Sequence, residues 1–217
     1  ESSRYVPTNA AHRKCGFIKA EMNRFDEQFW SNRYENLQIG WDTGGPTTPF
    51  VELFKSIEDK SIAILIPGCG YGHEGEYLFH LGFTNVTLLD VSALARNEFL
   101  KRVPNFPAEH FLLGDFFSHS GSYDLILEQT FFCALEPNLR PEYAAKMFAL
   151  LKPGGKLQGL LFNFGLTEVG PPFGGSKEEY LNYFESFFNI KQCEPCHNSI
   201  KPRMGNELFI DLEKPLI

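Results

Sequence analysis

The chain has 217 residues, of which 43% are apolar and 22% charged, a composition typical of one globular domain that excludes a fibrous or largely disordered chain. No apolar run approaches the about 20 residues that span a bilayer, and no leader-like segment stands at the start, so we expect a cytoplasmic protein without a membrane partner. The net charge of −7 disfavours nucleic acid as a partner, because phosphate backbones are bound by clustered positive charge.

Residues 1–24 show no periodicity, and the first predicted element is a helix at residues 25–37, where aromatic side chains recur at helical spacing. A glycine-rich loop follows. The remaining predicted elements are, in order, a helix at 48–57, a strand at 62–66, a helix at 73–81, a strand at 85–91, a helix from Ser92 to the residue before Pro104, strands at 110–116 and 123–130, a helix at 141–151, a strand at 157–164, a helix at 176–188, and strands at 190–193 and 207–212. The Lys-Pro-Gly-Gly stretch at 152–155 is interpreted as a helix stop signal.

This alternation of strands and helices predicts an α/β fold with a mostly parallel sheet of seven strands and helices on both faces. The last two strands are expected to form an antiparallel hairpin. We interpret residues 1–47 as an N-terminal extension that folds over the sheet, and residues 48–217 as the main domain.

Glycines, carboxylates and one aromatic ring stand at the ends of four predicted strands. In a parallel sheet, ligands bind beyond the carboxyl ends of the strands. Glycines permit close approach of the backbone to a ligand, a carboxylate can accept hydrogen bonds from both ribose hydroxyls, and a carboxylate beside a ring suits adenine. The residues are, in strand order, Gly68 and Gly70, Asp90, Asp115 and Phe116, and Gln129. Together they indicate a cofactor that contains adenosine.

Two cofactor classes contain adenosine and fit such a sheet. The dinucleotide fingerprint requires a small residue at the position where this chain has His73, which disfavours an NAD-type oxidoreductase. S-adenosylmethionine has no phosphate and makes no such demand. The predicted C-terminal hairpin also favours a methyltransferase over a dehydrogenase.

Several segments resemble the thiopurine S-methyltransferase family, and within it most closely the plant-type thiol and halide (thiocyanate) methyltransferases. The resemblance spans roughly residues 25–215. The segments that carry it are Phe-Trp at 29–30, Gly-Trp-Asp-Thr-Gly at 40–44, Ile-Pro-Gly-Cys-Gly-Tyr-Gly-His at 66–73, Phe-Phe-Cys-Ala-Leu-Glu-Pro at 131–137, Arg-Pro at 140–141 and Gly-Pro-Pro-Phe at 170–173.

The resemblance implies a class I (Rossmann-like) methyltransferase fold with S-adenosyl-L-methionine as methyl donor and S-adenosyl-L-homocysteine as product. The cofactor-binding residues that it implies are Trp30, Tyr34, Trp41, Gly68, Gly70, Asp90, Asp115, Phe116 and Gln129. The 1–47 extension is then a lid over the cofactor. Plant members usually have Trp at the position of Tyr34, Tyr at the position of Gln129, and Tyr at the position of Phe173 beside the acceptor pocket, where the thiopurine branch also has Phe. These departures concern the acceptor more than the cofactor.

The acceptor pocket is predicted beside Arg140, Tyr143 and Phe173, with Trp41 and Phe131 as further walls. Arg140 is the candidate that holds an anionic acceptor, and Tyr143 lies one helical turn further on. No general base is assigned, because a thiolate, thiocyanate, halide or related chalcogen anion is already deprotonated. Faces of Trp30, Trp41 and Phe132 are candidates for cation–π contact with a sulfonium.

Three alternatives stay open: a thiopurine-type aromatic thiol as acceptor, a scaffold that binds the cofactor without acceptor chemistry, and the disfavoured oxidoreductase. We expect a small-molecule partner, a monomer or weak homodimer, and no metal. Cys193, Cys196 and His197 match the C-x-x-C-H haem pattern, but the simpler interpretation is two reduced thiols and a histidine in a surface connection. His73, Glu74 and His110 are interpreted as structural.

Overall fold

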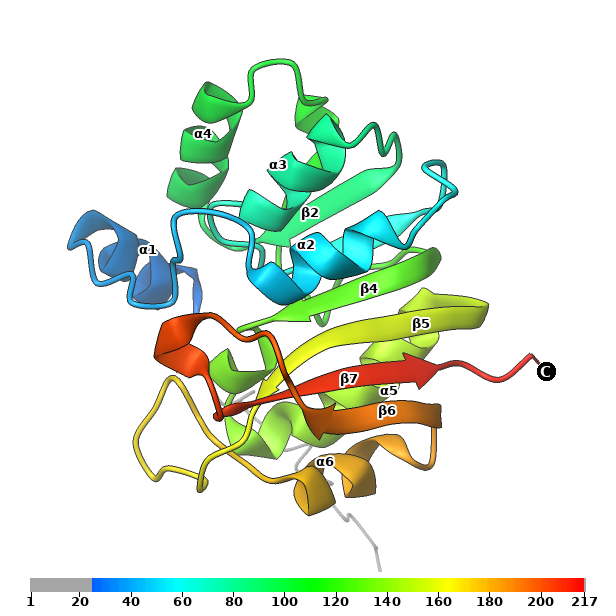
Figure 1. Cartoon of the computed structure of the whole chain (residues 1–217). Helices are drawn as coiled ribbons and strands as arrows, with labels where there is room; N and C mark the ends of the chain where they lie inside the picture. Colours follow the sequence, from blue (N-terminus) through cyan, green and yellow to red (C-terminus); the bar gives the residue numbers. More distant parts are fainter. Residues whose placement is uncertain (1–24, 217) are drawn as a thin grey trace, which may run out of the picture.

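The computed structural model describes residues 25–216, which form a seven-stranded sheet with helices on both faces (Figure 1). The strand order is β3-β2-β1-β4-β5-β7-β6; the first five strands are parallel, and β7 runs antiparallel to both β5 and β6. The strands are β1 (Ile64–Pro67), β2 (Val86–Asp90), β3 (Phe111–Leu113), β4 (Tyr123–Gln129), β5 (Leu151–Phe162), β6 (Asn189–Pro195) and β7 (Glu207–Glu213). The predicted α/β class, seven strands and C-terminal hairpin are confirmed.

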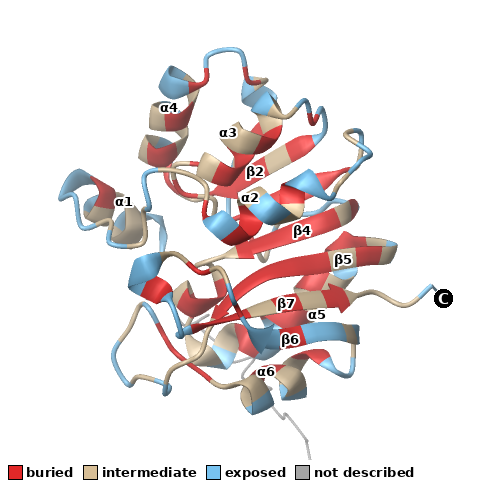
Figure 2. Cartoon of the chain, in the orientation of Figure 1, coloured by how far each residue is buried: buried red, intermediate tan, exposed pale blue. Residues whose placement is uncertain are grey.

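The helices cover the two faces of the sheet through two separate apolar clusters. They are α1 (Glu27–Glu35), α2 (Thr48–Lys55), α3 (His73–His80), α4 (Ala93–Arg102), α5 (Arg140–Leu150) and α6 (Lys177–Phe184). Side chains of α2, α3 and α4 pack on one face, and those of α5 and α6 pack on the other. Successive residues of β1 alternate between the clusters, because strand side chains point to opposite faces: Ile64 joins the first and Leu65 the second. Strand β1 is buried throughout, and β2 and β4 on either side of it are buried over most of their length (Figure 2).

The two largest differences from the predicted element boundaries are at the start of β5, where strand pairing overrides the local stop signal, and at the end of α6. Strand β5 begins at Leu151, directly after α5, so the Lys-Pro-Gly-Gly stretch lies inside the strand. Leu151 pairs with Tyr123, and the register then shifts until Lys156 pairs with Leu125. The stretch is therefore an irregularity that keeps its strand beside β4. Helix α6 also ends at Phe184, four residues before the predicted end.

Local caps explain where two helices begin. The Ser92 hydroxyl accepts a hydrogen bond from the Ala95 amide at 3.3 Å, which fixes the start of α4 as predicted. The Asp26 carboxylate accepts one from the Phe29 amide at 3.0 Å and starts α1. Within residues 25–216, no helix combines the length and the hydropathy that a bilayer crossing requires.

Candidate active site

A cavity of about 350 Å³ lies at the carboxyl ends of the parallel strands, a volume within the range of small-molecule sites. Its walls come from α1 and the loop after it, from the turns that follow β1, β2, β3 and β4, and from the end of β5, the following loop and the connection between β6 and β7. Seven of the nine predicted cofactor residues line it: Trp30, Tyr34, Trp41, Gly68, Asp90, Asp115 and Phe116. Gly70 and Gln129 do not.

The glycine turn after β1 is shaped by direct packing of side chains on its main chain. Gly68 and Gly70 have φ of +57° and +55°, the left-handed region that glycine adopts without strain. A Cβ at Gly68 would lie 2.3 Å from Cδ2 of Phe131, and one at Gly70 would lie 3.1 Å from the Tyr34 hydroxyl. Aromatic side chains therefore occupy the space that a larger residue at either position would need.

Asp90 links the glycine turn to the start of α4. Its Oδ2 accepts a hydrogen bond from the Gly70 amide at 2.8 Å, and its Oδ1 accepts one from the Ser92 amide at 2.9 Å. The residue is 8% exposed, and burial raises the pKa of its carboxyl group. An ionised carboxylate has about four lone-pair sites. Because Asp90 also lines the cavity, its carboxylate can accept hydrogen bonds from a bound ligand such as a ribose.

The adenine side of the cavity is formed by the turn after β3. Oδ2 of Asp115 accepts hydrogen bonds from the Ser118 amide and hydroxyl at 2.9 and 3.0 Å, which fixes an otherwise exposed carboxylate. Phe116 is buried, and its ring lies edge-on to Phe131 with centroids 5.1 Å apart. A fixed carboxylate beside an aromatic wall fits an adenine amine and ring.

Three rings from residues 25–47 form the cover of the cavity. Trp41 lies edge-on to both Trp30 and Tyr34, with centroid distances of 5.4 and 5.5 Å. The Trp30 indole donates to the carbonyl of Phe25 at 3.0 Å. These rings pack on one another and also face the cavity, so they combine a structural role with the capacity to surround a cation.

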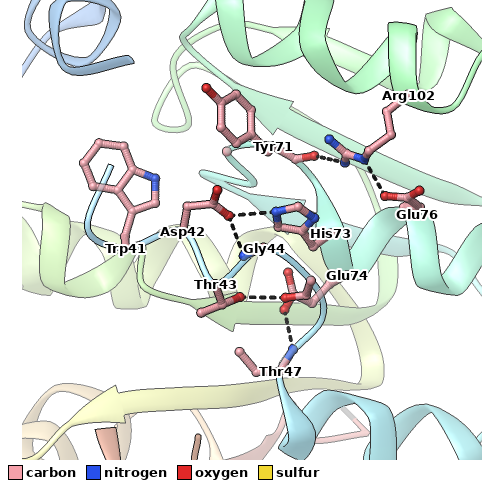
Figure 3. A network of polar contacts seen from close by, with 12 residues as sticks. Trp41, Asp42, Thr43, Gly44, Thr47, Tyr71, His73, Glu74, Glu76 and Arg102 are labelled. Atoms are coloured by element: carbon pink, nitrogen blue, oxygen red, sulfur yellow. Dashed lines mark hydrogen bonds and ion pairs between the residues drawn. The ribbon is translucent and has the colours of Figure 1, made fainter. Parts of the chain in front are cut away.

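The loop that carries Trp41 is fixed to α3 by polar contacts (Figure 3). Asp42 Oδ1 lies 2.7 Å from Nε2 of His73, and the same oxygen accepts the Gly44 amide at 3.1 Å. The buried Glu74 accepts the Thr47 amide at 3.2 Å. Both acceptors, like His73, hold the loop in place, which is the structural role expected for His73 and Glu74.

The structure places Arg140 outside the cavity, so its predicted place in the acceptor pocket is wrong. The side chain is fully buried; Nη1 donates to Glu179 at 2.6 Å and Nη2 to the carbonyl of Gly174 at 2.8 Å. The guanidinium also lies over the ring of Phe132, 4.7 Å from its centroid. Phe132 is buried beneath it and does not line the cavity; Phe131 does.

Tyr143, Phe173 and Gln129 also lie behind the cavity wall rather than in it. The buried Tyr143 donates its hydroxyl proton to Glu128. The Phe173 amide donates to the carbonyl of Cys133 at 2.7 Å, while its neighbours Pro171 and Pro172 line the cavity. These positions depend on contacts between segments that are far apart in the chain. Local sequence patterns carry no information on such contacts.

Two arginines that the sequence analysis did not select line the cavity instead. Arg203 ends the 3₁₀ turn η4 (Lys201–Arg203); its Nη2 donates to the carbonyl of Trp41 at 2.7 Å, and its Nη1 lies 3.6 Å from Glu207. Arg33 of α1 lies over the Phe29 ring, 4.8 Å from its centroid. Arg203 is in an irregular connection between two strands, so no periodic signal points to it.

The C-x-x-C-H segment is divided between two parts of the protein core. Cys193 packs in the cluster under α5 and α6, whereas Cys196 packs in the cluster under α2, α3 and α4. His197 is exposed, and its Nε2 lies 3.8 Å from Glu52. The two thiols therefore face opposite sides of the sheet. The expected surface connection is wrong for both cysteines, because Cys193 lies in β6 and both thiols are buried in the core; it holds for His197.

Comparison with known proteins agrees with this geometry. The profile of the thiopurine S-methyltransferase family matches residues 25–209. The chain is 36% identical over 156 residues to a probable thiol methyltransferase 2 of Arabidopsis thaliana, covering 70% of this chain and 69% of that protein. It is 30% identical over 193 residues to thiocyanate methyltransferase 1 of Brassica oleracea, covering 84% and 83%.

A bacterial relative and a solved structure extend the comparison. Thiopurine S-methyltransferase of Vibrio cholerae is 28% identical over 176 residues, covering 73% of this chain and 81% of that protein. The structure of a Burkholderia thailandensis 1,6-didemethyltoxoflavin-N1-methyltransferase with bound S-adenosylhomocysteine superposes with a TM-score of 0.70 at 16% identity, covering 87% of each chain, and shows the shared fold. The chain belongs to the thiopurine S-methyltransferase family and is an S-adenosylmethionine-dependent methyltransferase.

Proposed function

We propose that this methyltransferase acts on a small soft anion, namely a thiolate, thiocyanate, halide or related chalcogen anion. The observation that carries the proposal is an apolar cavity wall that contains the buried guanidinium of Arg203. The apolar part consists of Phe131, Leu135, Phe162, Pro171 and Pro172. Such a wall removes water from an anion, and the guanidinium compensates its charge.

Arg203 replaces Arg140 as the residue that we assign to the acceptor anion. It is 8% exposed and lines the cavity. Its Nη1 is buried and lies 3.6 Å from a carboxylate oxygen of Glu207, with which it forms an ion pair. The neighbouring Glu207 is buried too, and burial raises the pKa of its carboxyl group. The contacts with Trp41 and Glu207 therefore hold the guanidinium in the cavity wall, where its positive charge can attract an anionic acceptor.

The cavity favours an acceptor that is already deprotonated. None of its described lining residues is a histidine. Both oxygens of Asp90 accept main-chain hydrogen bonds, and burial raises the pKa of the Cys133 thiol well above its ordinary value, so that it stays protonated. An alcohol or amine acceptor would need a base. The other lining carboxylate, Asp115, accepts hydrogen bonds from Ser118 and lies on the side of the cavity that we assign to adenine.

In the reaction, bound S-adenosylmethionine supplies an electrophilic methyl group on a sulfonium. The described residues contribute alignment and a dry site. Asp90 and the glycine turn fix the adenosine and its ribose, the rings of Trp30 and Trp41 provide electron-rich faces near the cationic end, and Arg203 orients the anion. Alignment of this kind is worth roughly 7–11 kcal/mol of an in-line displacement barrier.

Arg203→Ala is expected to raise KM for thiocyanate by roughly 10- to 100-fold, because a charge-assisted hydrogen bond contributes about 1.5–3 kcal/mol. The affinity for S-adenosylhomocysteine should change much less. Steady-state kinetics and calorimetry measure the two quantities. Arg33→Ala serves as the matched control, since it removes the other guanidinium of the lining. Equal KM values for wild type and Arg203→Ala would contradict the assignment.

The pH dependence of turnover should differ between a thiol, which must lose a proton to react, and thiocyanate, which is already an anion. We expect the ratio of thiol to thiocyanate turnover to rise about tenfold per pH unit until the pH approaches the thiol pKa near 8.5. Taking the ratio cancels any titration within the enzyme. A ratio that stays constant from pH 6 to 8 would show that the enzyme itself deprotonates the thiol.

A panel of acceptors that includes iodide and a thiopurine tests the wider acceptor class and the aromatic-thiol alternative.

Residues 25–47, part of the proposed 1–47 lid, are expected to become better protected when the cofactor site is filled. Ser31 Oγ of α1 lies 3.5 Å from Ser92 Oγ, whereas residues 42–47 are tied to α3 by the shorter contacts of Asp42 and Thr47. Hydrogen exchange should therefore slow most in α1 on addition of S-adenosylhomocysteine, with a smaller change at residues 44–47. Unchanged exchange in α1 would refute the lid. Cytoplasmic location and a monomeric or weakly dimeric state stay predictions.

A further inference from the structure

The turn after β4 reverses the chain sharply beside the cavity. Thr130 has a φ of +56°, a backbone conformation that is an outlier for a β-branched residue. The reversal directs the amides of Phe131 and Phe132 back toward the strand, where both donate to Oε1 of Glu128 at 2.8 Å. The 3₁₀ turn η2 (Phe132–Ala134) continues from there. Glu128 therefore caps this turn with its side chain.

Glu128 is satisfied entirely from within the protein. It is fully buried, and its second oxygen accepts the hydroxyl of Tyr143 from α5. Within residues 25–216, no lysine, arginine or histidine forms an ion pair with it. A buried carboxylate without a cationic partner is costly to keep, and such groups concentrate at functional sites.

The turn that Glu128 caps forms one wall of the cavity. Phe131 packs so tightly on Gly68 that a Cβ there would lie 2.3 Å from its ring. The same ring lies edge-on to Phe116 on the adenine side, at 5.1 Å between centroids. Thr130 and Cys133 from the same turn also line the cavity. The side chain of Glu128 does not reach the cavity, but its hydrogen bonds fix the residues that do.

We propose that Glu128 is a positioning residue for methyl transfer, which holds the turn after β4 so that Phe131 stands between Gly68 and Phe116. The proposal rests on the proposed function for its activity readout. Tyr143, which we expected to touch the acceptor, acts through Glu128 by orienting its second oxygen.

If Glu128 is a positioning residue, its ionisation should produce a measurable pH dependence of activity. Burial raises the pKa of this carboxyl group to about 7. The titratable groups that face it are Tyr143 from α5 and Cys133 from η2. Burial raises the pKa of both groups, so they stay neutral. The positive charges of Arg140 and Arg203 act on Cys133. The ionised carboxylate accepts all three hydrogen bonds, whereas the protonated form carries a donor on one oxygen.

Activity and stability should consequently change in opposite directions with pH. Because the pKa in the folded protein lies above that of an unfolded glutamate, the contribution of Glu128 to stability is complete below about pH 4.5 and is lost as pH rises through about 7. The positioning role predicts that turnover of thiocyanate rises over this same interval. A purely structural carboxylate would give no such rise.

The test is a double-mutant cycle between Glu128→Gln and Phe131→Ala, with Asp124→Asn as the matched control. Asp124 lies at the other end of β4, where its carboxylate accepts the Ala63 amide at 2.8 Å and Lys152 at 2.7 Å. We expect Glu128→Gln to fold, to lower kcat for thiocyanate at least tenfold, and to lose the rise in turnover near pH 7. The double variant should be no worse than Phe131→Ala alone. Asp124→Asn should keep the wild-type profile.

The same cycle on affinity for S-adenosylhomocysteine, measured by calorimetry, needs no acceptor. It therefore distinguishes failure of this proposal from failure of the proposed acceptor class. Tyr143→Phe, which leaves the carboxylate in place, should shift the pH profile of turnover without abolishing activity. Full activity of folded Glu128→Gln with an unchanged pH profile, or additive effects of the two substitutions on both readouts, would overturn the proposal.

Discussion

Replacing Asp90 with alanine is expected to weaken binding of S-adenosylhomocysteine by at least tenfold. The carboxylate is held between the amides of Gly70 and Ser92 and lines the cavity, where we propose that it also accepts hydrogen bonds from the ribose. Loss of two charge-assisted hydrogen bonds to a ribose costs roughly 1.5–3 kcal/mol each, so the full effect can exceed a hundredfold. Calorimetry with purified protein measures it directly.

The controls separate lost cofactor contacts from local disorder. Asp90 also anchors the glycine turn, so Asp90→Asn, which keeps one acceptor oxygen, should bind better than Asp90→Ala. Asp115→Ala removes the more exposed carboxylate and should weaken binding less. The unfolding midpoint of each variant shows whether it is folded. An unchanged dissociation constant in folded Asp90→Ala would remove Asp90 from the cofactor site.

Arg140→Ala is expected to lower the free energy of unfolding by about 3 kcal/mol, because breaking a buried ion pair and emptying the space of its side chain are both destabilising. The guanidinium joins α6 through Glu179 and the loop after β5 through the carbonyl of Gly174. For a chain of this size, the melting temperature should fall by roughly 6–12 °C. Differential scanning calorimetry gives both values.

Two comparisons define the role of Arg140. Arg140→Met keeps an unbranched apolar side chain beneath Phe132 and should recover part of the loss. Lys177→Ala breaks the exposed ion pair with Glu194 and should change stability far less. If Arg140→Ala instead left stability intact and raised only KM for thiocyanate, the buried position of this arginine would be contradicted.

The residues at the strand ends that line the cavity could be predicted because their signals are local. A glycine turn after a buried strand, a carboxylate at the end of the next strand and a serine cap on the following helix each depend on a few neighbouring residues. In a parallel sheet, the ends of β1, β2 and β3 meet at one edge, so the position along the chain gives the position in space. Gly68, Asp90 and Asp115 therefore line the cavity as predicted.

The acceptor half was decided by contacts between segments far apart in the chain. From the sequence, Arg140 is expected to be a solvent-exposed arginine at the start of a helix. In the structure it is buried and donates a hydrogen bond to Glu179, 39 positions later. Arg203 carries no pattern, yet it reaches the carbonyl of Trp41 across 162 positions and so enters the cavity wall. The sequence alone determines which residues end each strand, because that depends on local periodicity. The direction of a long charged side chain depends on which distant partners offset its loss of hydration, and only the tertiary structure decides that.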